Sequence, residues 1–228
     1  MLVSVCGMPR SGSTYSFNIV RELLGVRGGC DVAASLVTDQ VIRDSTSKHV
    51  IIKNHDVDAY GVRLLKIEAM KGICTIRNPF EAIESWMDVF GFDLSQAIDD
   101  FRKWLFSYNN FSQSVLVVKF EDVEKSPLRV SWSIARYLGL MVGPGEIWEL
   151  KKKYSKASVR QASLQLKKDA AGVLDLGFSY FDKANFFHRR HVREEKRVFL
   201  SASDRKHILN EIDGLEQFCK AHAFPIIE

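Results

Sequence analysis

The ten residues CGMPRSGSTY (Cys6–Tyr15) nearly match the Walker A loop, G-x-x-x-x-G-K-[ST]. In that loop, backbone N–H groups cradle phosphates, a lysine neutralises them and a hydroxyl holds Mg²⁺. Gly7, Gly12 and Thr14 fit the pattern, but Ser13 stands where the lysine should be. An apolar run precedes the loop and a helical period follows it, so the loop is expected to present a helix N-terminus to an anion. Another residue must then supply the positive charge.

Short strand-like runs alternate with helical periods along the first 140 residues. Apolar or β-branched residues predict strands at 2–6, 49–53, 72–76 and 114–120. Helices are predicted from near Ser13 to Gly25, from Pro79, and after Asp93 as an N-cap. This order predicts an α/β fold, a P-loop-like three-layer sandwich with a central parallel sheet and helices on both faces. Ligands of such folds bind beyond the carboxyl ends of the strands.

Two segments lack a clear period. Residues 27–35 (RGGCDVAAS) are interpreted as a loop, and residues 155–197 as a long basic connection that contains the aromatic cluster FSYFDKANFF. Helical patterns occupy residues 146–156 and 201–222. Connections as long as the second segment are usually functional or mobile.

Length and composition favour one domain, residues 1–228, because 46% of the residues are hydrophobic. A net charge of +4 suits anionic ligands but is too small to indicate nucleic-acid binding. The four cysteines form no C-x-x-C pair, which favours a reducing compartment. No secretory leader or membrane-spanning run is recognised, so we expect a cytoplasmic protein that does not insert into membranes.

The stretch PRSGSTY resembles the 5′-phosphosulfate loop of sulfotransferases that use 3′-phosphoadenosine-5′-phosphosulfate (PAPS). That family keeps the Walker-like turn but carries its catalytic cation, lysine or arginine, near the start of the loop, and Arg10 matches this position. The resemblance implies a phosphosulfate cradle formed by Arg10, Ser11, Gly12, Ser13 and Thr14. It also implies that Tyr15 stacks on adenine, where many members have tryptophan.

A second match lies in TIRNPFEAIES. In the family, an arginine that ends the third strand and a serine eight residues later hold the 3′-phosphate, and Arg77 and Ser85 occupy these positions. Arginine presents a planar fork that suits phosphate oxygens, and the Asn78-Pro79 turn would place Ser85 about two turns into the next helix. Taken alone, the pair is equally compatible with a strand-end charge and a helix-surface serine.

A third match is VIIKNHD. The cytosolic sulfotransferases carry Lys-x-His after the second strand, with the histidine as general base for the acceptor hydroxyl, and Lys53 and His55 match this motif. The resemblance therefore implies His55, Lys53 and Arg10 as catalytic residues, with His55 titrating near pH 6 to 7. Asp56 either orients the imidazole or is solvated. Glu84 is too far along the next motif to be our choice of base.

The resemblance extends less fully toward the C-terminus. Phe120 in KFEDV matches a family aromatic that contacts adenine, a stacking contact that contributes about 1–3 kcal/mol, although a core role is equally open. The segment FFHRRHVREEKRVFLSASD has the position and charge of the family's basic loop but lacks its glycine. Arg189 and Arg190 are candidate 3′-phosphate contacts, as are His188 and His191, and a solvated basic surface is the alternative.

The resemblance implies sulfonate transfer from PAPS to a hydroxyl or amine acceptor, with adenosine 3′,5′-bisphosphate (PAP) as product. We expect no metal, because a sulfonyl group carries less charge than a phosphoryl group and fixed cations can stabilise its transfer. The acceptor is left open between a glycan and a small apolar alcohol. Candidate lining residues for the latter are Trp86, Phe90, Phe92, Phe178, Tyr180 and Phe181.

Two alternatives remain at this stage. One is a P-loop nucleotide kinase or NTPase, with Thr14 as Mg²⁺ ligand and the carboxylates that follow VLVVKF as further metal ligands. The misplaced cation counts against it. The other is a non-catalytic adenine-nucleotide binder that keeps the cradle without turnover.

Overall fold

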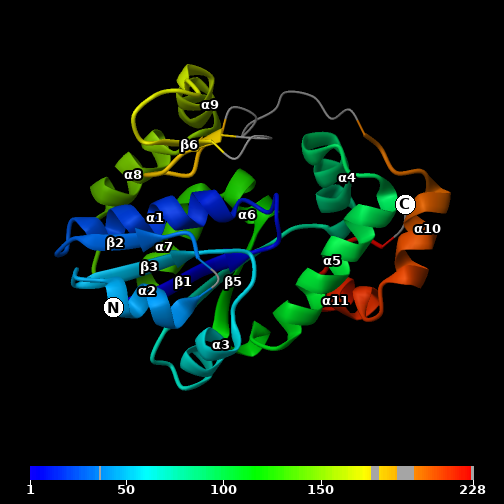
Figure 1. Ribbon diagram of the computed structural model, residues 1–228, viewed down its shortest axis with the longest axis horizontal. Coiled ribbons are helices and arrows are strands. Elements are labelled where there is room, and N and C mark those ends of the chain that lie inside the picture. Colours follow the sequence, from blue (N-terminus) through cyan, green and yellow to red (C-terminus); the bar gives the residue numbers. More distant parts are fainter. Residues whose placement is uncertain (36, 176–179, 189–197, 227–228) are drawn as a thin grey trace.

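The computed structural model describes residues 1–35, 37–175, 180–188 and 198–226 (Figure 1). Its centre is a five-stranded sheet in the order β2-β3-β1-β4-β5, in which every neighbouring pair is parallel. The strands are β1 (Leu2–Gly7), β2 (Cys30–Ala33), β3 (His49–Lys53), β4 (Lys71–Ile76) and β5 (Val115–Lys119). The predicted α/β fold with a central parallel sheet is confirmed.

Strand β2 was not predicted, because residues 27–35 were interpreted as a loop. It is a four-residue edge strand whose side chains are all only half-buried, so it lacks the apolar run of a central strand. The Asp31 carboxylate accepts hydrogen bonds from the N–H groups of Thr46 and Ser47, at 2.7 and 2.9 Å, which fixes the segment that enters β3. Strand β5 is shorter than predicted and ends at Lys119.

Helices cover both faces of the sheet (Figure 1). One face packs against α1 (Ser13–Gly25), α7 (Pro127–Tyr137), α8 (Pro144–Lys153) and α9 (Lys156–Gln165). The opposite face packs against α3 (Ala59–Lys66), α4 (Pro79–Phe90), α5 (Leu94–Asn109), α10 (Ala202–Glu211) and α11 (Leu215–Ala221). The remaining short helices are α2 (Thr38–Asp44), α6 (Phe120–Lys125) and a 3₁₀ turn (Ser112–Ser114).

The predicted helix starts are confirmed at two places by their caps. The Asn78 side chain accepts hydrogen bonds from the first N–H groups of α4, and Pro79 occupies the first helical position. Asp93 and Gln96 form a reciprocal capping box at the start of α5. The helical pattern at 201–222, in contrast, is broken into α10 and α11 by Gly214, which adopts the left-handed conformation (φ 79°).

Residues 155–197 contain more regular structure than their sequence indicates. Helix α9 begins at Lys156, where the Ser155 hydroxyl caps it, and β6 (Val173–Asp175) pairs antiparallel with β7 (Tyr180–Asp182). Residues 189–197, and with them the candidate residues Arg189, Arg190 and His191, lie outside the described part of the chain.

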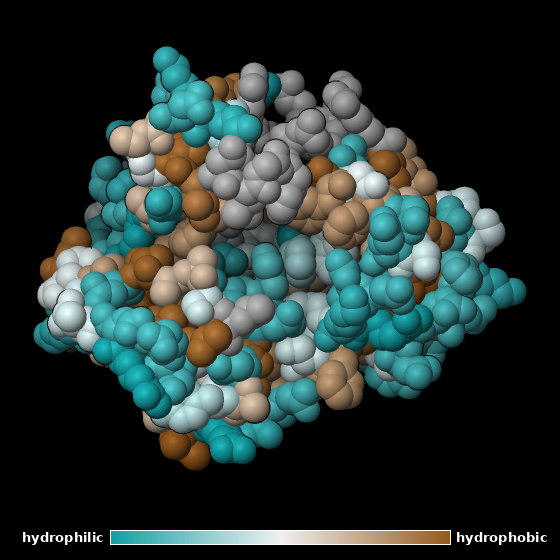
Figure 2. Space-filling model, in the orientation of Figure 1, coloured by the Kyte–Doolittle hydropathy of each residue, from teal (hydrophilic) through white to brown (hydrophobic). Residues whose placement is uncertain are grey.

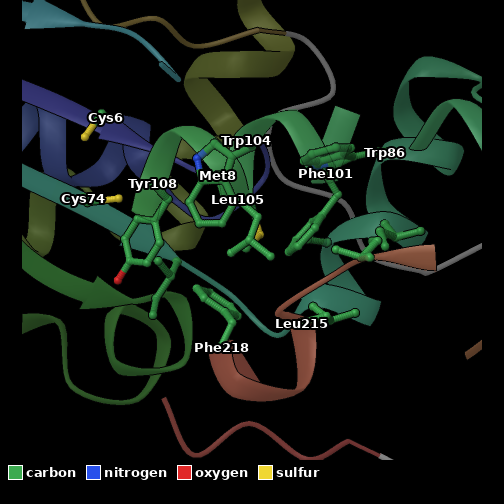
Figure 3. Packing of buried hydrophobic residues seen from close by; sticks show 14 of the residues in the cluster. Cys6, Met8, Cys74, Trp86, Phe101, Trp104, Leu105, Tyr108, Leu215 and Phe218 are labelled. Atoms are coloured by element: carbon green, nitrogen blue, oxygen red, sulfur yellow. The ribbon is translucent and has the colours of Figure 1, made fainter. Parts of the chain in front are cut away.

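An aromatic core fills the space between α4, α5 and α11 (Figure 3). The Trp104 and Tyr108 rings stack at 5.1 Å, and Phe218 approaches both rings edge-on. Trp86 is 1% exposed, so it belongs to this core rather than to an acceptor pocket. Phe90 is exposed and its ring lies 5.5 Å from that of Phe92, whereas Phe178 lies outside the described residues.

Hydrophilic residues dominate the face shown in Figure 2, and hydrophobic residues form small groups among them. No helix within the described ranges is long and apolar enough to cross a membrane. All four cysteines are free thiols, and Cys6 and Cys74 are fully buried in strands, where cysteine acts as a small hydrophobe.

Candidate active site

Strand β1 ends at Gly7, where its backbone presses against β4. A Cβ atom at Gly7 would lie 2.2 Å from Thr75 Oγ1 and 2.6 Å from the Thr75 carbonyl oxygen, so only glycine fits. Ser11 closes the turn, because its fully buried hydroxyl lies 2.5 Å from the Met8 carbonyl and 2.7 Å from Thr75 Oγ1. The Ser11 N–H also donates to the Met8 carbonyl. Ser11 therefore shapes the loop, and its hydroxyl is not available for the predicted contact with a cofactor.

Helix α1 begins without a cap. Gly12 is its N-cap residue in the left-handed conformation (φ 83°), no side chain caps the helix, and its first turn holds no acidic residue. Within the described residues, the backbone N–H groups of Gly12, Ser13 and Thr14 have no hydrogen-bond acceptor. Three adjacent donors at the positive end of a helix dipole suit an anionic oxygen.

Arg10 has a left-handed backbone (φ 65°), which is uncommon for a residue other than glycine. Two hydrogen bonds hold the backbone in this conformation. The Trp86 indole N–H on α4 donates to the Pro9 carbonyl at 2.7 Å, and Arg77, just before α4, donates to the Arg10 carbonyl at 3.4 Å. The Arg10 side chain donates from Nε to Ser85 Oγ at 3.1 Å. Arg10, predicted to bind the 5′-phosphosulfate, and Ser85, predicted to bind the 3′-phosphate, are thus in direct contact.

Arg77 follows β4 and lies at the same edge of the sheet. Its guanidinium donates to Glu81 Oε2 from Nε (3.2 Å) and Nη2 (2.7 Å), and it lies 4.3 Å above the centre of the Phe120 ring. Phe120 also touches Gly12, where an added Cβ would lie 3.1 Å from the ring. The structure therefore brings Arg77 and Phe120 together next to the cradle, with Glu81 as an ion-pair partner that the sequence analysis missed.

Tyr15 anchors the first turn of α1 to α7. Its hydroxyl donates to the Pro127 carbonyl at 3.1 Å and contacts Ser131 Oγ at 3.0 Å. Burial raises the pKa of the Tyr15 phenol, and the Ser131 hydrogen bond opposes that rise. This side chain belongs in part to the core, and its stacking on adenine stays a prediction.

Lys53 ends β3 beneath the cradle. Its side chain is buried, and Nζ donates to Ser13 Oγ at 2.8 Å. Burial lowers the Lys53 pKa to about 8, because water no longer solvates the ammonium. The Lys53 ammonium therefore lies beside Ser13, the residue that replaces the Walker lysine, although Lys53 belongs to β3 and not to the loop.

His55 lies two residues beyond β3. Its Nδ1 is 2.8 Å from the Gly7 carbonyl, which can only accept, so Nδ1 carries the proton and Nε2 presents a lone pair. Desolvation by the surrounding protein and the nearby Lys53 ammonium lower the His55 pKa, and the hydrogen bond to Gly7 opposes this lowering. Part of the His55 side chain remains exposed to water. A pKa lowered in this way favours a neutral His55 at pH 7 in the protein without ligand, below the expected titration near pH 6 to 7.

The nearby carboxylates have other partners. Asp56 is exposed, and the His55 Nδ1 faces the Gly7 carbonyl, so Asp56 does not orient the ring through Nδ1. Glu84 is buried and accepts the Leu200 N–H at 3.1 Å, which agrees with our decision not to choose it as base. Glu121 accepts the Asn78 N–H at 3.2 Å and so fixes the loop before α4.

Comparison with known proteins identifies the fold. Mouse sulfotransferase SULT7A1 complexed with PAP matches with 13% identity and a TM-score of 0.64, over 92% of this chain and 82% of that chain. Retinol dehydratase with retinol and PAP matches with 12% identity and a TM-score of 0.58, over 93% and 80%. Its complex with androsterone and inactive cofactor PAP matches with 12% identity and a TM-score of 0.55, over 96% and 79%.

No family model and no curated protein sequence matches the chain. The protein therefore has the fold of mouse sulfotransferase SULT7A1 and of retinol dehydratase, which confirms the fold that the resemblance of its loop predicted, and identities of 12–13% show the fold alone. No group of three or more histidine, cysteine, aspartate or glutamate side chains that could hold a metal ion occurs within the described residues.

We predict that Lys53→Met stabilises the protein at pH 7. The Lys53 pKa falls from 10.5 to about 8 on folding, and each pKa unit corresponds to about 1.4 kcal/mol. After loss of the Ser13 hydrogen bond, worth about 1 kcal/mol, a net gain of about 2 kcal/mol is expected in urea unfolding.

The pH dependence of this stability difference follows from proton linkage. Folding disfavours the ammonium, so the cost is complete below pH 8 and disappears as pH rises toward 10.5, the value of the unfolded chain. Wild-type stability relative to Lys53→Met should therefore rise over that interval. Lys103→Met, at a side chain that is 76% exposed, is the matched control and should change little. A Lys53→Met protein that is less stable than wild type at pH 7 would contradict the assignment.

Proposed function

We propose that this protein transfers a sulfonate group from PAPS to a hydroxyl or amine acceptor. The observation that carries the proposal is the uncapped start of α1, which lies between two cations that come from different parts of the chain. Arg10 extends from the loop toward Ser85, and Lys53 reaches Ser13 from β3. The arrangement suits a terminal anion bound by backbone N–H groups and fixed charges.

The sheet order brings these groups to one end of the sheet. Strand β1 lies between β3 and β4. The connection from β1 to β2 runs through α1 on one face of the sheet, and the connection from β3 to β4 runs through α3 on the other, so the strand order reverses here, which is where doubly wound folds bind ligands. Gly7, Lys53 and Arg77 lie at or just beyond the carboxyl ends of these three strands. Structures of the same fold hold PAP, which supports a related nucleotide here.

The position of Lys53 gives a reason why the loop itself can lack a lysine. In a Walker A loop the ammonium comes from the loop itself. Here the corresponding position is Ser13, and the Lys53 ammonium lies 2.8 Å from its hydroxyl, so a cation occupies similar space from another strand. This feature favours sulfonate transfer over the kinase alternative, because the loop needs no lysine of its own.

The residues around the crevice have distinct proposed roles. The Gly12, Ser13 and Thr14 N–H groups and Arg10 would bind the 5′-phosphosulfate, while Arg77 and Ser85 would hold the 3′-phosphate. Tyr15 and Phe120 would contact adenine. PAPS supplies the sulfonate and a phosphate leaving group, and no metal is required in the proposal.

His55 would act as general base. Its Nε2 lone pair accepts the proton of the acceptor hydroxyl, whose oxygen forms a new S–O bond as the S–O bond to the phosphate breaks. Arg10 and Lys53 stabilise the charge that develops on the leaving oxygen. The lowered pKa keeps the imidazole unprotonated, and the anionic donor would raise that pKa when it binds.

Arg77→Ala should weaken PAP binding by roughly 1.5–3 kcal/mol, since a charged hydrogen-bond partner of the 3′-phosphate is lost. Binding of adenosine 5′-phosphate, which lacks the 3′-phosphate, should change little. Calorimetry in EDTA compares both ligands. Arg43→Ala is a matched control, because Arg43 also pairs with a carboxylate four residues away but is exposed on α2.

Equal losses for both nucleotides would assign Arg77 a structural role. If the wild-type protein bound ATP with Mg²⁺ strongly and PAP weakly, the kinase alternative would replace the proposal.

His55→Ala should reduce transfer of labelled sulfonate from PAPS by about 10²–10⁴-fold while PAP binding is retained, because only general-base catalysis is removed. The rate of transfer to an acidic phenol should fall less than the rate of transfer to an alkyl alcohol, since the phenol releases its proton more readily. His207→Ala, at an exposed histidine on α10, is the control. Transfer to an alkyl alcohol at the wild-type rate would eliminate His55 as the base.

A further inference from the structure

We infer that His188 is a positioning residue for Arg10, in which a neutral imidazole accepts a hydrogen bond from the guanidinium and fixes its direction in the cradle. The inference rests on the proposed function, in which Arg10 stabilises the transferring group. His188 Nε2 lies 3.1 Å from Arg10 Nη1, although 178 residues separate them in the chain. The sequence analysis offered His188 as a candidate 3′-phosphate contact, but no sequence feature connected its imidazole to Arg10.

The chemistry of the two groups defines the tautomer. Every guanidinium nitrogen donates and none accepts, so His188 Nε2 must be the acceptor and the ring proton must reside on Nδ1. A protonated His188 could not make this contact and would repel Arg10. The contact therefore requires a neutral imidazole.

Ser85 provides the second fixed point. It accepts from Arg10 Nε at 3.1 Å, so two different nitrogens of one planar guanidinium are held by two different elements, α4 and the segment after β7. A planar fork held at two nitrogens keeps a single orientation, whereas a lysine ammonium rotates freely about its stem. This double contact gives a physical reason for arginine at position 10.

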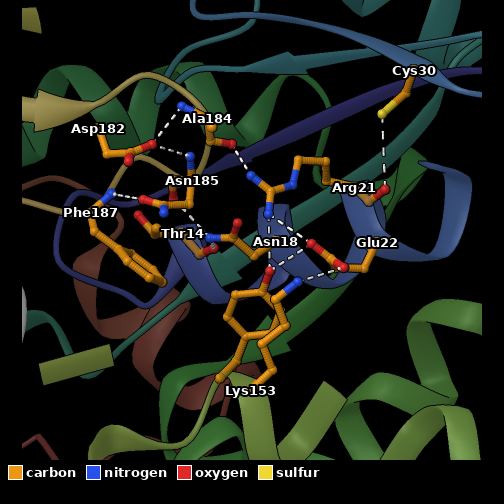
Figure 4. A network of polar contacts seen from close by, with 11 residues as sticks. Thr14, Asn18, Arg21, Glu22, Cys30, Lys153, Asp182, Ala184, Asn185 and Phe187 are labelled. Carbon is orange, nitrogen blue, oxygen red and sulfur yellow. Dashed lines mark hydrogen bonds and ion pairs between the residues drawn. The ribbon is translucent and has the colours of Figure 1, made fainter. Parts of the chain in front are cut away.

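The segment that carries His188 is itself anchored to the protein. A bridge pairs His188 with Phe181 on β7, and the Asp182 carboxylate accepts the N–H groups of Ala184 and Asn185 at 2.7 and 3.0 Å (Figure 4). These contacts close a tight turn just before His188. The imidazole therefore emerges from an ordered turn.

Helix α1 then holds this turn against the loop that it follows. Asn18 donates to the Asn185 carbonyl at 2.8 Å, and Arg21 donates to the Ala184 carbonyl (Figure 4). The Phe186 ring packs edge-on against Phe17 at 4.9 Å. Because α1 also begins at the cradle, one helix positions both the N–H donors and the support for Arg10.

The test compares two substitutions at His188. His188→Gln retains an acceptor oxygen at the distance of Nε2, whereas His188→Leu keeps bulk but accepts nothing. Loss of a hydrogen bond to a charged group should lower kcat of His188→Leu by about 10-fold or more, with a smaller change in the Kd of PAP. His188→Gln should recover most of the wild-type kcat, and His207→Gln should have no effect.

A separate readout does not depend on turnover. In ¹⁵N spectra of histidine-labelled protein without nucleotide, His188 should show a protonated Nδ1 and a hydrogen-bonded, unprotonated Nε2, and Arg10→Met should shift the Nε2 signal. Wild-type protein that neither binds PAP nor transfers sulfonate would contradict the proposed function, while these spectra would still decide the Arg10 contact. Protonated Nε2, wild-type kcat in His188→Leu, or equal loss in His188→Gln and His188→Leu would overturn the inference.

Discussion

The close approach of Gly7 to Thr75 controls the geometry of the site. Because no side chain fits between β1 and β4 at this point, the chain turns directly from the strand end into the loop, and the Ser11 hydroxyl fastens that loop to the same threonine. The Gly7 carbonyl also orients the His55 imidazole. One contact between two backbones therefore connects the anion cradle to the candidate base.

In the proposed site, cations from separate elements of the fold stand in for a single loop lysine. Arg10 is held at two nitrogens, by Ser85 and His188, and Lys53 reaches Ser13 from beneath the loop. Burying the Lys53 ammonium lowers its pKa and costs folding free energy, as is common where charge is kept ready for a ligand. An anionic ligand would relieve that cost by pairing with the ammonium.

Sequence patterns predicted the fold where the local signals were strong. Apolar runs marked the central strands, and Asn78-Pro79 and Asp93 marked helix starts. The edge strand β2 was not predicted, because its side chains are only half-buried and its sequence lacks an apolar run. Motif spacing identified residues that gather at the carboxyl ends of β1, β3 and β4, but the buried role of Ser11 depends on tertiary contacts. The lowered His55 pKa depends on its surroundings in the same way, and no spacing rule encodes either property.

The central claim is that the N–H groups at the start of α1 bind the terminal anion of a bisphosphate nucleotide without metal. Amide spectra of ¹⁵N-labelled protein, recorded in EDTA during titration with PAP, test it most directly. Large downfield shifts of the Gly12, Ser13 and Thr14 amide signals that saturate with PAP are expected. Amide signals that stay unchanged with PAP, or that respond only to ATP with Mg²⁺, would contradict it.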